Sequence, residues 1–179
     1  MENYKKNLEL LTKNHVYSKE MEHDACGVGV IASTEGKKSR AVVEYGIEAL
    51  KAVWHRGAVD ADGKTGDGAG IHLEIPKDFF LVFIEVTGHD YDNSEICVGM
   101  IFLPRNDYSS QESCKTIVES ELTKNNFSIY GWRQVPVNPK ILGEKAFQTM
   151  PEIIQVLFKP NDKSLLDKNL ERKIYETRK

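Results

Sequence analysis

The sequence predicts an α+β fold in which strands follow one another in adjacent runs and do not alternate strictly with helices. Glu95–Leu103 and Glu152–Pro160, both rich in apolar residues, are strand candidates. Elsewhere, after Ser39 and after Ser164, apolar residues recur at helical spacing. A chain of 179 residues with 40% hydrophobic content is long enough to bury a core.

The first half of the chain alternates short apolar segments with turn residues. CGVGVIAS, which starts at Cys26, is expected to be a buried strand. Ser39 is a plausible N-cap for a helix that runs to about Trp54. HRGAVDADGKTGDGAG is too rich in glycine and aspartate for regular structure, so we expect a long loop. AGIHLEIP is expected to resume as a strand, and Pro76 to begin a short helix or turn. The expected apolar face of the helix consists of Val42, Val43, Ile47, Leu50, Val53 and Trp54.

The second half carries the strongest strand patterns. Glu95–Leu103 is closed by Pro104, and Ser109 or Ser110 is then expected to cap a helix. The elements expected after this strand are, in chain order, the helix ending near Asn125 and Asn126, the strand FSIYGWRQVPV interrupted by Gly131 and Pro136, a short helix over Gly143–Thr149, the strand Glu152–Pro160, and a helix from Ser164 to Lys179.

Composition and charge exclude several classes of function. The net charge is -3 with the two signs interspersed, which argues against a nucleic-acid footprint. The most apolar stretch, Phe79–Val86, is too short to span a membrane and contains a glutamate. The three cysteines form no C-x-x-C pair, so a disulfide framework or metal site is not expected and a reducing cytoplasm is the default. Cys97 is expected in the core, whereas Cys114 lies in a polar helical pattern.

The Gly-Lys-Thr triplet in the predicted loop resembles a phosphate-binding loop, but its spacing fails. That motif needs glycine where Ala58 stands, and Asp60 and Asp62 would face the phosphates. A calcium loop would need glycine in place of Thr65 and glutamate in place of Ile71. Nucleotide and calcium binding are therefore disfavoured.

Four glycines between Gly63 and Gly70 cost backbone entropy that a simple connector need not incur. A solvated turn is the plain alternative. Glycine at this density favours close backbone approach to another group, so we expect a loop shaped around a catalytic pocket.

Cys26 is the candidate catalytic nucleophile if cleavage makes it the first residue of the chain. A cysteine attacks as its thiolate and needs a base, but no histidine, His23, His55 or His72, is an obvious partner. Cleavage between Ala25 and Cys26 would create an α-amine with a pKa near ~7.7–8.0 beside the thiol. That amine could take the thiol proton and later return a proton to the leaving group.

Two coupled segments carry a family resemblance: DACGVGVIAS, followed by ALKAVWHRGAVDADGKTGDGAGI. They resemble the class II glutamine amidotransferase domain at the amino-terminal end of the glutamate synthase large subunit. The later segments ICVGMIFLP, YGWRQVPVN and EIIQVLFKP also resemble it in order and spacing, so the likeness covers nearly all of residues 22–179. The resemblance implies the four-layer αββα N-terminal nucleophile fold, incomplete at the carboxyl end, and hydrolysis of glutamine to glutamate and ammonia through a cysteinyl thioester.

The same resemblance implies a leader or propeptide over residues 1–25 and the first part of the domain over residues 26–179. It implies Cys26 as nucleophile, Arg56 as a support of the pocket, and no metal. The adjoining wall is expected to comprise Gly63, Gly66, Asp67 and Gly68. FMN and an iron–sulfur cluster are expected outside this segment, in an oxidoreductase that assimilates ammonia. Expected partners are glutamine, the remaining synthase domains and a small subunit or ferredoxin; the electron donor, nicotinamide or ferredoxin, stays open.

Other residues of the family's site are expected past residue 179: an arginine for the substrate carboxylate, an Asn-Gly oxyanion hole and an aspartate for the substrate amine. We therefore expect a truncated domain with negligible glutaminase activity, because one oxyanion-hole donor is typically worth ~10²–10³ in rate. With its leader attached, Cys26 has an amide nitrogen that cannot act as the base, so an inactive precursor is expected. The alternative is a non-catalytic module of the same descent.

Overall fold

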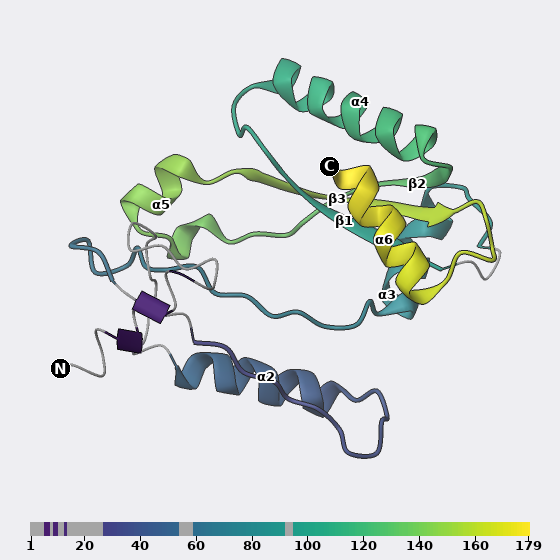
Figure 1. Cartoon of the computed structure of the whole chain (residues 1–179). Helices are drawn as coiled ribbons and strands as arrows, with labels where there is room; N and C mark the ends of the chain where they lie inside the picture. Colours follow the sequence, from purple (N-terminus) through teal and green to yellow (C-terminus); the bar gives the residue numbers. More distant parts are fainter. Residues whose placement is uncertain (1–5, 8, 11–12, 14–26, 54–58, 92–94) are drawn as a thin grey trace. The chain divides into compact units, whose positions relative to one another are not determined.

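The computed structural model describes residues 6–7, 9–10, 13, 27–53, 59–91 and 95–179 (Figure 1). The chain divides into two compact units. The N-terminal unit comprises residues 1–58 and 68–71, and the sheet unit comprises residues 59–67 and 72–179. Among the described residues, no helix has the length and apolar character needed to cross a bilayer.

A three-stranded antiparallel sheet forms the centre of the sheet unit. The strands are β1 (Cys97–Leu103), β2 (Phe127–Gln134) and β3 (Glu152–Pro160), and β3 lies between the other two. β3 has the predicted bounds, and β1 falls within its predicted range. Five consecutive residues of β3 are buried, and all of them except Gln155 are apolar, as expected for a strand that is covered on both faces.

Helices cover both faces of this sheet. Val156 and Leu157 are neighbours on β3 and therefore point to opposite faces. Val156 shares a buried cluster with residues of α4 (Tyr108–Lys124) and α6 (Asp167–Arg178). Leu157 packs in a second cluster with residues of α3 (Lys77–Val86). The prediction of an α+β fold is confirmed for the described part of the chain.

A β-bulge in β2 follows from a glycine. The register against β3 shifts between Ile129 and Gly131, and Gly131 has a positive φ of 151°. A Cβ at residue 131 would lie 2.8 Å from the Thr87 Cγ2 atom, so only glycine fits without displacement. The sequence predicted interruptions at Gly131 and Pro136. The strand continues past Gly131, with the bulge there, and ends before Pro136.

Three helix boundaries differ from the prediction for local reasons. The N-cap of α4 is Asp107, whose side chain accepts hydrogen bonds from the Ser110 backbone N–H at 3.0 Å and the Ser110 hydroxyl at 2.6 Å. Ser110 is thus already inside the helix. α6 begins at Asp167, because the Ser164 hydroxyl bonds the Asp162 carboxylate in a turn before it. α3 is ten residues long, more than a short helix or turn.

Two expected strands do not form. Residues 27–33 and 69–76 carry no strand assignment. Val28 is 89% exposed, so the first segment is not buried as predicted, and Leu73 in the second is 43% exposed. A strand needs a pairing partner, and the sheet pairs only β1, β3 and β2 in the described part of the chain.

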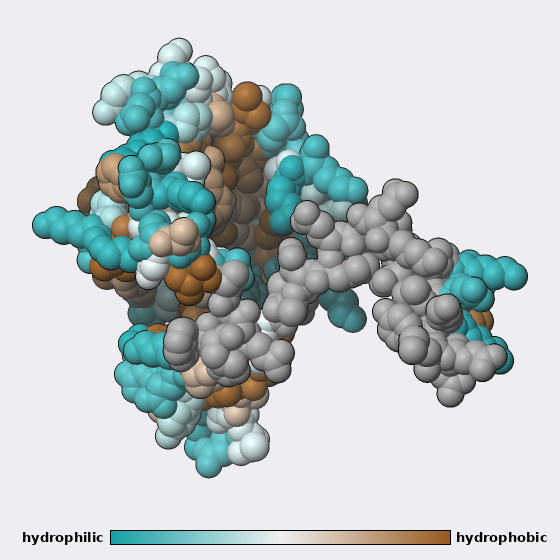
Figure 2. All heavy atoms as spheres, turned by 90° about the vertical axis from the view of Figure 1, so that its left-hand side faces the viewer, coloured by the Kyte–Doolittle hydropathy of each residue, from teal (hydrophilic) through white to brown (hydrophobic). Residues whose placement is uncertain are grey.

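The N-terminal unit contains α2 (Arg40–Ala52). Its N-cap is Ser39, whose hydroxyl accepts a hydrogen bond from the Ala41 backbone N–H at 3.2 Å, as the sequence predicted. Its apolar face is only half-buried, and Trp54 lies outside the described residues. Apolar side chains also stay exposed in the sheet unit, where Met100 and Phe102 of the edge strand β1 are 48% and 64% exposed. Hydrophobic surface is visible between hydrophilic side chains in the upper half of Figure 2.

Candidate functional site

The predicted nucleophile and its support fall outside the described residues. These two residues are Cys26 and Arg56. The described remainder of the predicted site is the glycine-rich loop. Its residues 59–67 belong to the sheet unit, and residues 68–71 belong to the N-terminal unit.

Residues 59–66 form a closed turn. Val59 and Gly66 pair in an isolated antiparallel bridge, and the Asp60 backbone N–H donates to the Thr65 carbonyl at 2.7 Å. Gly63 has a φ of 69° at the tip, and its N–H donates to the Asp60 carbonyl at 2.9 Å. The prediction of a loop is confirmed here, and glycine at position 63 is explained by its left-handed backbone.

Asp62 organises the inside of this turn. Its Oδ1 atom accepts the backbone N–H groups of Lys64 at 2.9 Å and Thr65 at 2.7 Å, and its Oδ2 atom accepts the Thr65 hydroxyl at 2.5 Å. The side-chain hydrogen bond from Thr65 is the largest of the effects that lower the pKa of Asp62 to about 2. The Asp62 carboxylate therefore stays ionised and serves as an acceptor throughout the physiological pH range.

The same turn is fastened to a second segment far away in the sequence. Lys145 belongs to α5 (Glu144–Thr149), and its Nζ atom forms an ion pair with Asp60 Oδ2 at 2.6 Å. The Glu144 backbone N–H also contributes to the lowered pKa of Asp62. Gly143, the N-cap of α5, lies so close that a Cβ there would overlap with Thr65 and Asp62. Sequence reasoning missed these contacts, because only the Asp-x-x-Thr spacing of the turn is visible locally.

The predicted wall residues have unequal surroundings. Gly66 takes part in the bridge with Val59. No heavy atom of the described residues lies within 4 Å of a Cβ placed on Gly63 or Gly68, so close packing within this part of the chain does not explain these glycines. Asp67 interacts with another group of the protein.

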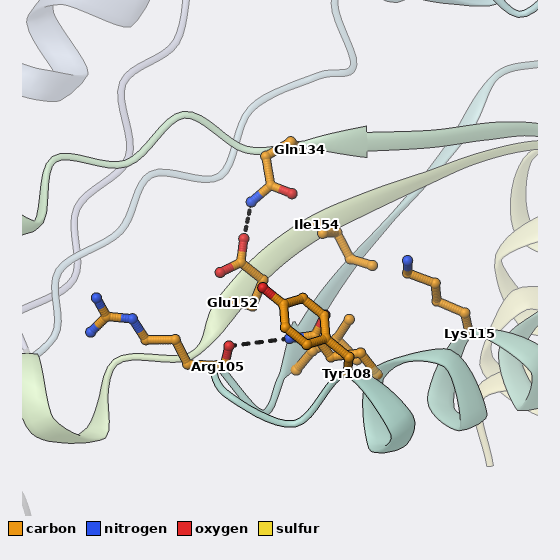
Figure 3. A pocket seen from close by; sticks show the side chains of 8 residues that line it. Arg105, Tyr108, Lys115, Gln134, Glu152 and Ile154 are labelled. Atoms are coloured by element: carbon orange, nitrogen blue, oxygen red, sulfur yellow. Dashed lines mark hydrogen bonds between the residues drawn. The ribbon is translucent and has the colours of Figure 1, made fainter.

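A separate polar hollow of about 220 Å³ lies at the end of the sheet beside α4 (Figure 3). Gln134 donates a hydrogen bond to Glu152, and the buried Gln111 amide donates to the Pro104 carbonyl at 2.6 Å. The Arg105 guanidinium lies 4.4 Å from the centre of the Phe147 ring. The full lining consists of Leu103, Arg105, Tyr108, Gln111, Lys115, Gln134, Glu152 and Ile154. This lining presents no nucleophile paired with a base.

The other cysteines are poor candidates for catalysis. Burial raises the pKa of the Cys97 thiol to about 12, so it stays protonated and inert, in agreement with its predicted place in the core. Cys114 is partly exposed on α4, and both are free thiols. Within the described ranges, no group of three histidine, cysteine, aspartate or glutamate side chains could hold a metal ion.

Known proteins resemble this chain closely along most of its length. A family model described as "Glutamine amidotransferases class-II" matches residues 26–179. The "Glutamate synthase [NADPH] large chain" of Azospirillum brasilense is 52% identical over 176 residues, which cover 98% of this chain and 12% of that protein. The "Ferredoxin-dependent glutamate synthase 1, chloroplastic/mitochondrial" of Arabidopsis thaliana is 42% identical over 88% of this chain and 10% of its own length.

The "Glutamate synthase [NADH]" of Saccharomyces cerevisiae is 38% identical over 83% of this chain and 7% of its own length. The chain thus spans roughly a tenth of the length of the curated relatives that it matches. Since the family model matches far more than half of the residues, the chain belongs to the class II glutamine amidotransferase family.

Proposed function

We propose that this chain is part of a glutaminase domain that serves glutamate synthesis, with Cys26 as its nucleophile. The observation that carries the proposal is the family match, which begins at Cys26 itself and continues to residue 179. Relatives that align with 83% to 98% of this chain are named glutamate synthases. The exclusion of Cys97 by burial also supports Cys26 as the reactive thiol.

In the proposed first step, the Cys26 sulfur attacks the side-chain amide carbon of glutamine. The thiol proton passes to the free α-amine of the same residue, directly or through one water. A tetrahedral intermediate forms, and the protonated amine then gives a proton to the departing nitrogen. Ammonia leaves and a thioester remains on Cys26.

In the proposed second step, a water molecule attacks the thioester carbon while the α-amine accepts its proton. The carbon–sulfur bond breaks, the thiol is restored, and glutamate is released. The role requires removal of residues 1–25, because an amide nitrogen has no basic lone pair. We propose residues 1–25 as the leader and residues 26–179 as the first part of the domain.

Arg56 is proposed to support the pocket beside Cys26, and the run Gly63, Gly66, Asp67 and Gly68 to form an adjoining wall. The described turn supports the second role, since no heavy atom of the described residues lies within 4 Å of a Cβ placed on Gly63 at its tip, which leaves room for a ligand there. Glutamine is the proposed substrate, and other glutamate synthase domains with a small subunit or ferredoxin are the proposed partners. None of these residues is proposed to bind FMN or the iron–sulfur cluster. The cysteine usage leads us to propose a cytoplasmic location.

The test compares the chain as given with a version that begins at Cys26. Both are treated with the glutamine analogue 6-diazo-5-oxo-L-norleucine, and the adduct is located by intact-mass and peptide mass spectrometry. We expect labelling at Cys26 only after residues 1–25 are removed, and slower labelling when glutamine is added.

Cys26→Ser and Cys114→Ala are the matched controls: the first should abolish labelling and the second should leave it unchanged. Equal labelling of Cys26 and Cys114 in the shortened chain would favour the alternative, a non-catalytic module of the same descent. Labelling with the leader still attached would overturn the role of the amine.

A further inference from the structure

We propose that Asp62, Thr65 and Gly143 form a clamp that positions the glycine-rich loop against the first turn of α5. The inference rests on the proposed function for the use of that loop as a pocket wall. Its observations come entirely from the sheet unit and are independent of where Cys26 lies.

The loop side of the clamp is built by one carboxylate. The Asp62 carboxylate accepts hydrogen bonds from two backbone N–H groups and one hydroxyl, so both of its oxygens are hydrogen-bonded within the turn. Such a side-chain turn fixes the backbone over Asp62–Thr65 without help from a strand or helix. The loop therefore has a shape of its own, which a chain of unconstrained glycines would lack.

The α5 side of the clamp requires glycine at position 143, because glycine has no Cβ atom. A Cβ atom there would overlap with Thr65 Oγ1 and Asp62 Oδ2 and would lie 2.6 Å from the Thr65 backbone nitrogen. Backbone and committed side chains cannot yield at this distance without opening the turn. Gly143 has a φ of -71°, so the close approach, and not its backbone conformation, requires glycine.

α5 is in turn held by the sheet. It lies between β2 and β3 in the chain, and its Phe147 carbonyl accepts a hydrogen bond from Arg105 at 3.5 Å. The Arg105 guanidinium also covers the Phe147 ring. Arg105 follows β1 by two residues, so the contacts run from the loop through α5 to the central sheet. The ion pair between Lys145 and Asp60 is a second, more exposed link at the same junction.

The consequence is a defined place for the turn over residues 59–67 of the sheet unit. Opening the clamp would release this turn from α5. In the proposed glutaminase domain, this would displace the wall and weaken substrate binding while leaving the Cys26 thiol chemically intact.

The first experiment measures loop order in the chain of residues 1–179. Amide hydrogen exchange at Lys64 and Thr65 and tryptic cleavage after Lys64 are compared in wild type, Asp62→Ala, Gly143→Ala and Asp62→Asn. We expect both rates to rise about 10-fold or more in the two disruptive variants, since several local hydrogen bonds are lost. Asp62→Asn keeps an acceptor for both backbone N–H groups and should largely restore wild-type rates.

Asp162→Ala is the matched control. Asp162 accepts the Ser164 backbone N–H at 2.9 Å and the Ser164 hydroxyl at 2.6 Å, a similar turn in a distant part of the sheet unit. Its loss should leave exchange at Lys64 unchanged. Circular dichroism of all variants checks that the fold persists. Unchanged exchange in both Asp62→Ala and Gly143→Ala would overturn the clamp.

A second arm connects the clamp with the pocket. In the version that begins at Cys26, the same variants are treated with 6-diazo-5-oxo-L-norleucine and, in parallel, with iodoacetamide. We expect a higher analogue concentration for half-maximal labelling rate in Asp62→Ala, rescue by Asp62→Asn, and an unchanged iodoacetamide rate. If wild type fails to react with the analogue, the proposed function is contradicted while the exchange data still decide the clamp. An altered loop with unchanged analogue labelling would overturn its positioning role.

Discussion

Gly99 of β1 lies directly opposite Val156 of β3, and a Cβ atom on residue 99 would lie 2.8 Å from Val156 Cγ1. Val156 is 2% exposed and belongs to the cluster beneath α4 and α6. Its branched side chain is confined to few rotamers and cannot move aside easily. The glycine in the middle of β1 is therefore a packing requirement of the central strand.

Gly99→Ala should destabilise the chain by about 1–3 kcal/mol, because the added methyl group overpacks the core. Urea unfolding followed by circular dichroism measures the change. Gly29→Ala is the matched control: among the residues that the structure describes, no heavy atom lies within 4 Å of a Cβ at position 29, and its effect should stay within about 0.5 kcal/mol. Equal effects of the two substitutions would contradict the packing argument.

Leu157→Ala should cost about 2–5 kcal/mol, because Leu157 is 1% exposed and packs against α3 from the central strand. The cavity would form between Phe80, Ile84 and Tyr130, which belong to the same cluster. The free energy of unfolding in urea is again the measurement. Val86→Ala removes an apolar side chain that is 82% exposed and should cost far less. A small effect at position 157 would mean that this face of the sheet is loosely packed.

The local sequence was sufficient to predict those elements whose residues carry the strand or helix-capping signal themselves. The strand pattern over Glu152–Pro160 predicted β3, and Ser39 predicted the start of α2. Two other apolar segments failed, over residues 27–33 and 69–76, because the formation of a strand depends on a partner that a local pattern does not contain.

In the candidate site, too, local features were predicted from the sequence and long-range contacts were not. The glycine count predicted the loop, and Gly63 indeed has a left-handed backbone. The pairing of Asp60 with Lys145 joins residues 85 positions apart, and no local pattern indicates such a contact. Cys26 and Arg56 fall outside the described residues, so their predicted roles stay predictions.

The turn at Asp62 should loosen only in strong acid. Hydrogen bonds from Thr65 and Lys64 lower the pKa of Asp62 from 3.8 to about 2 in the folded chain. Its contribution to stability is therefore fully present above about pH 4 and is lost as the pH falls toward 2. The Thr65 amide chemical shift, followed by NMR, should titrate with a midpoint near 2.

Asp62→Asn removes the titrating group and should abolish this transition. A midpoint near 3.8 in the wild type, the ordinary value for the residue, would show that the hydrogen bonds to Thr65 and Lys64 do not persist in solution.

The two described cysteines should differ sharply in their reaction with iodoacetamide. Cys97 is 5% exposed and its pKa is raised to about 12 by burial, so at pH 8 almost none of it is thiolate. Cys114 is partly exposed on α4. In the native chain, peptide mass spectrometry should find Cys114 alkylated and Cys97 unmodified, whereas both should react after denaturation in guanidinium. Comparable native rates at the two thiols would show that the start of strand β1 opens to solvent, and would remove one reason for assigning the chemistry to Cys26.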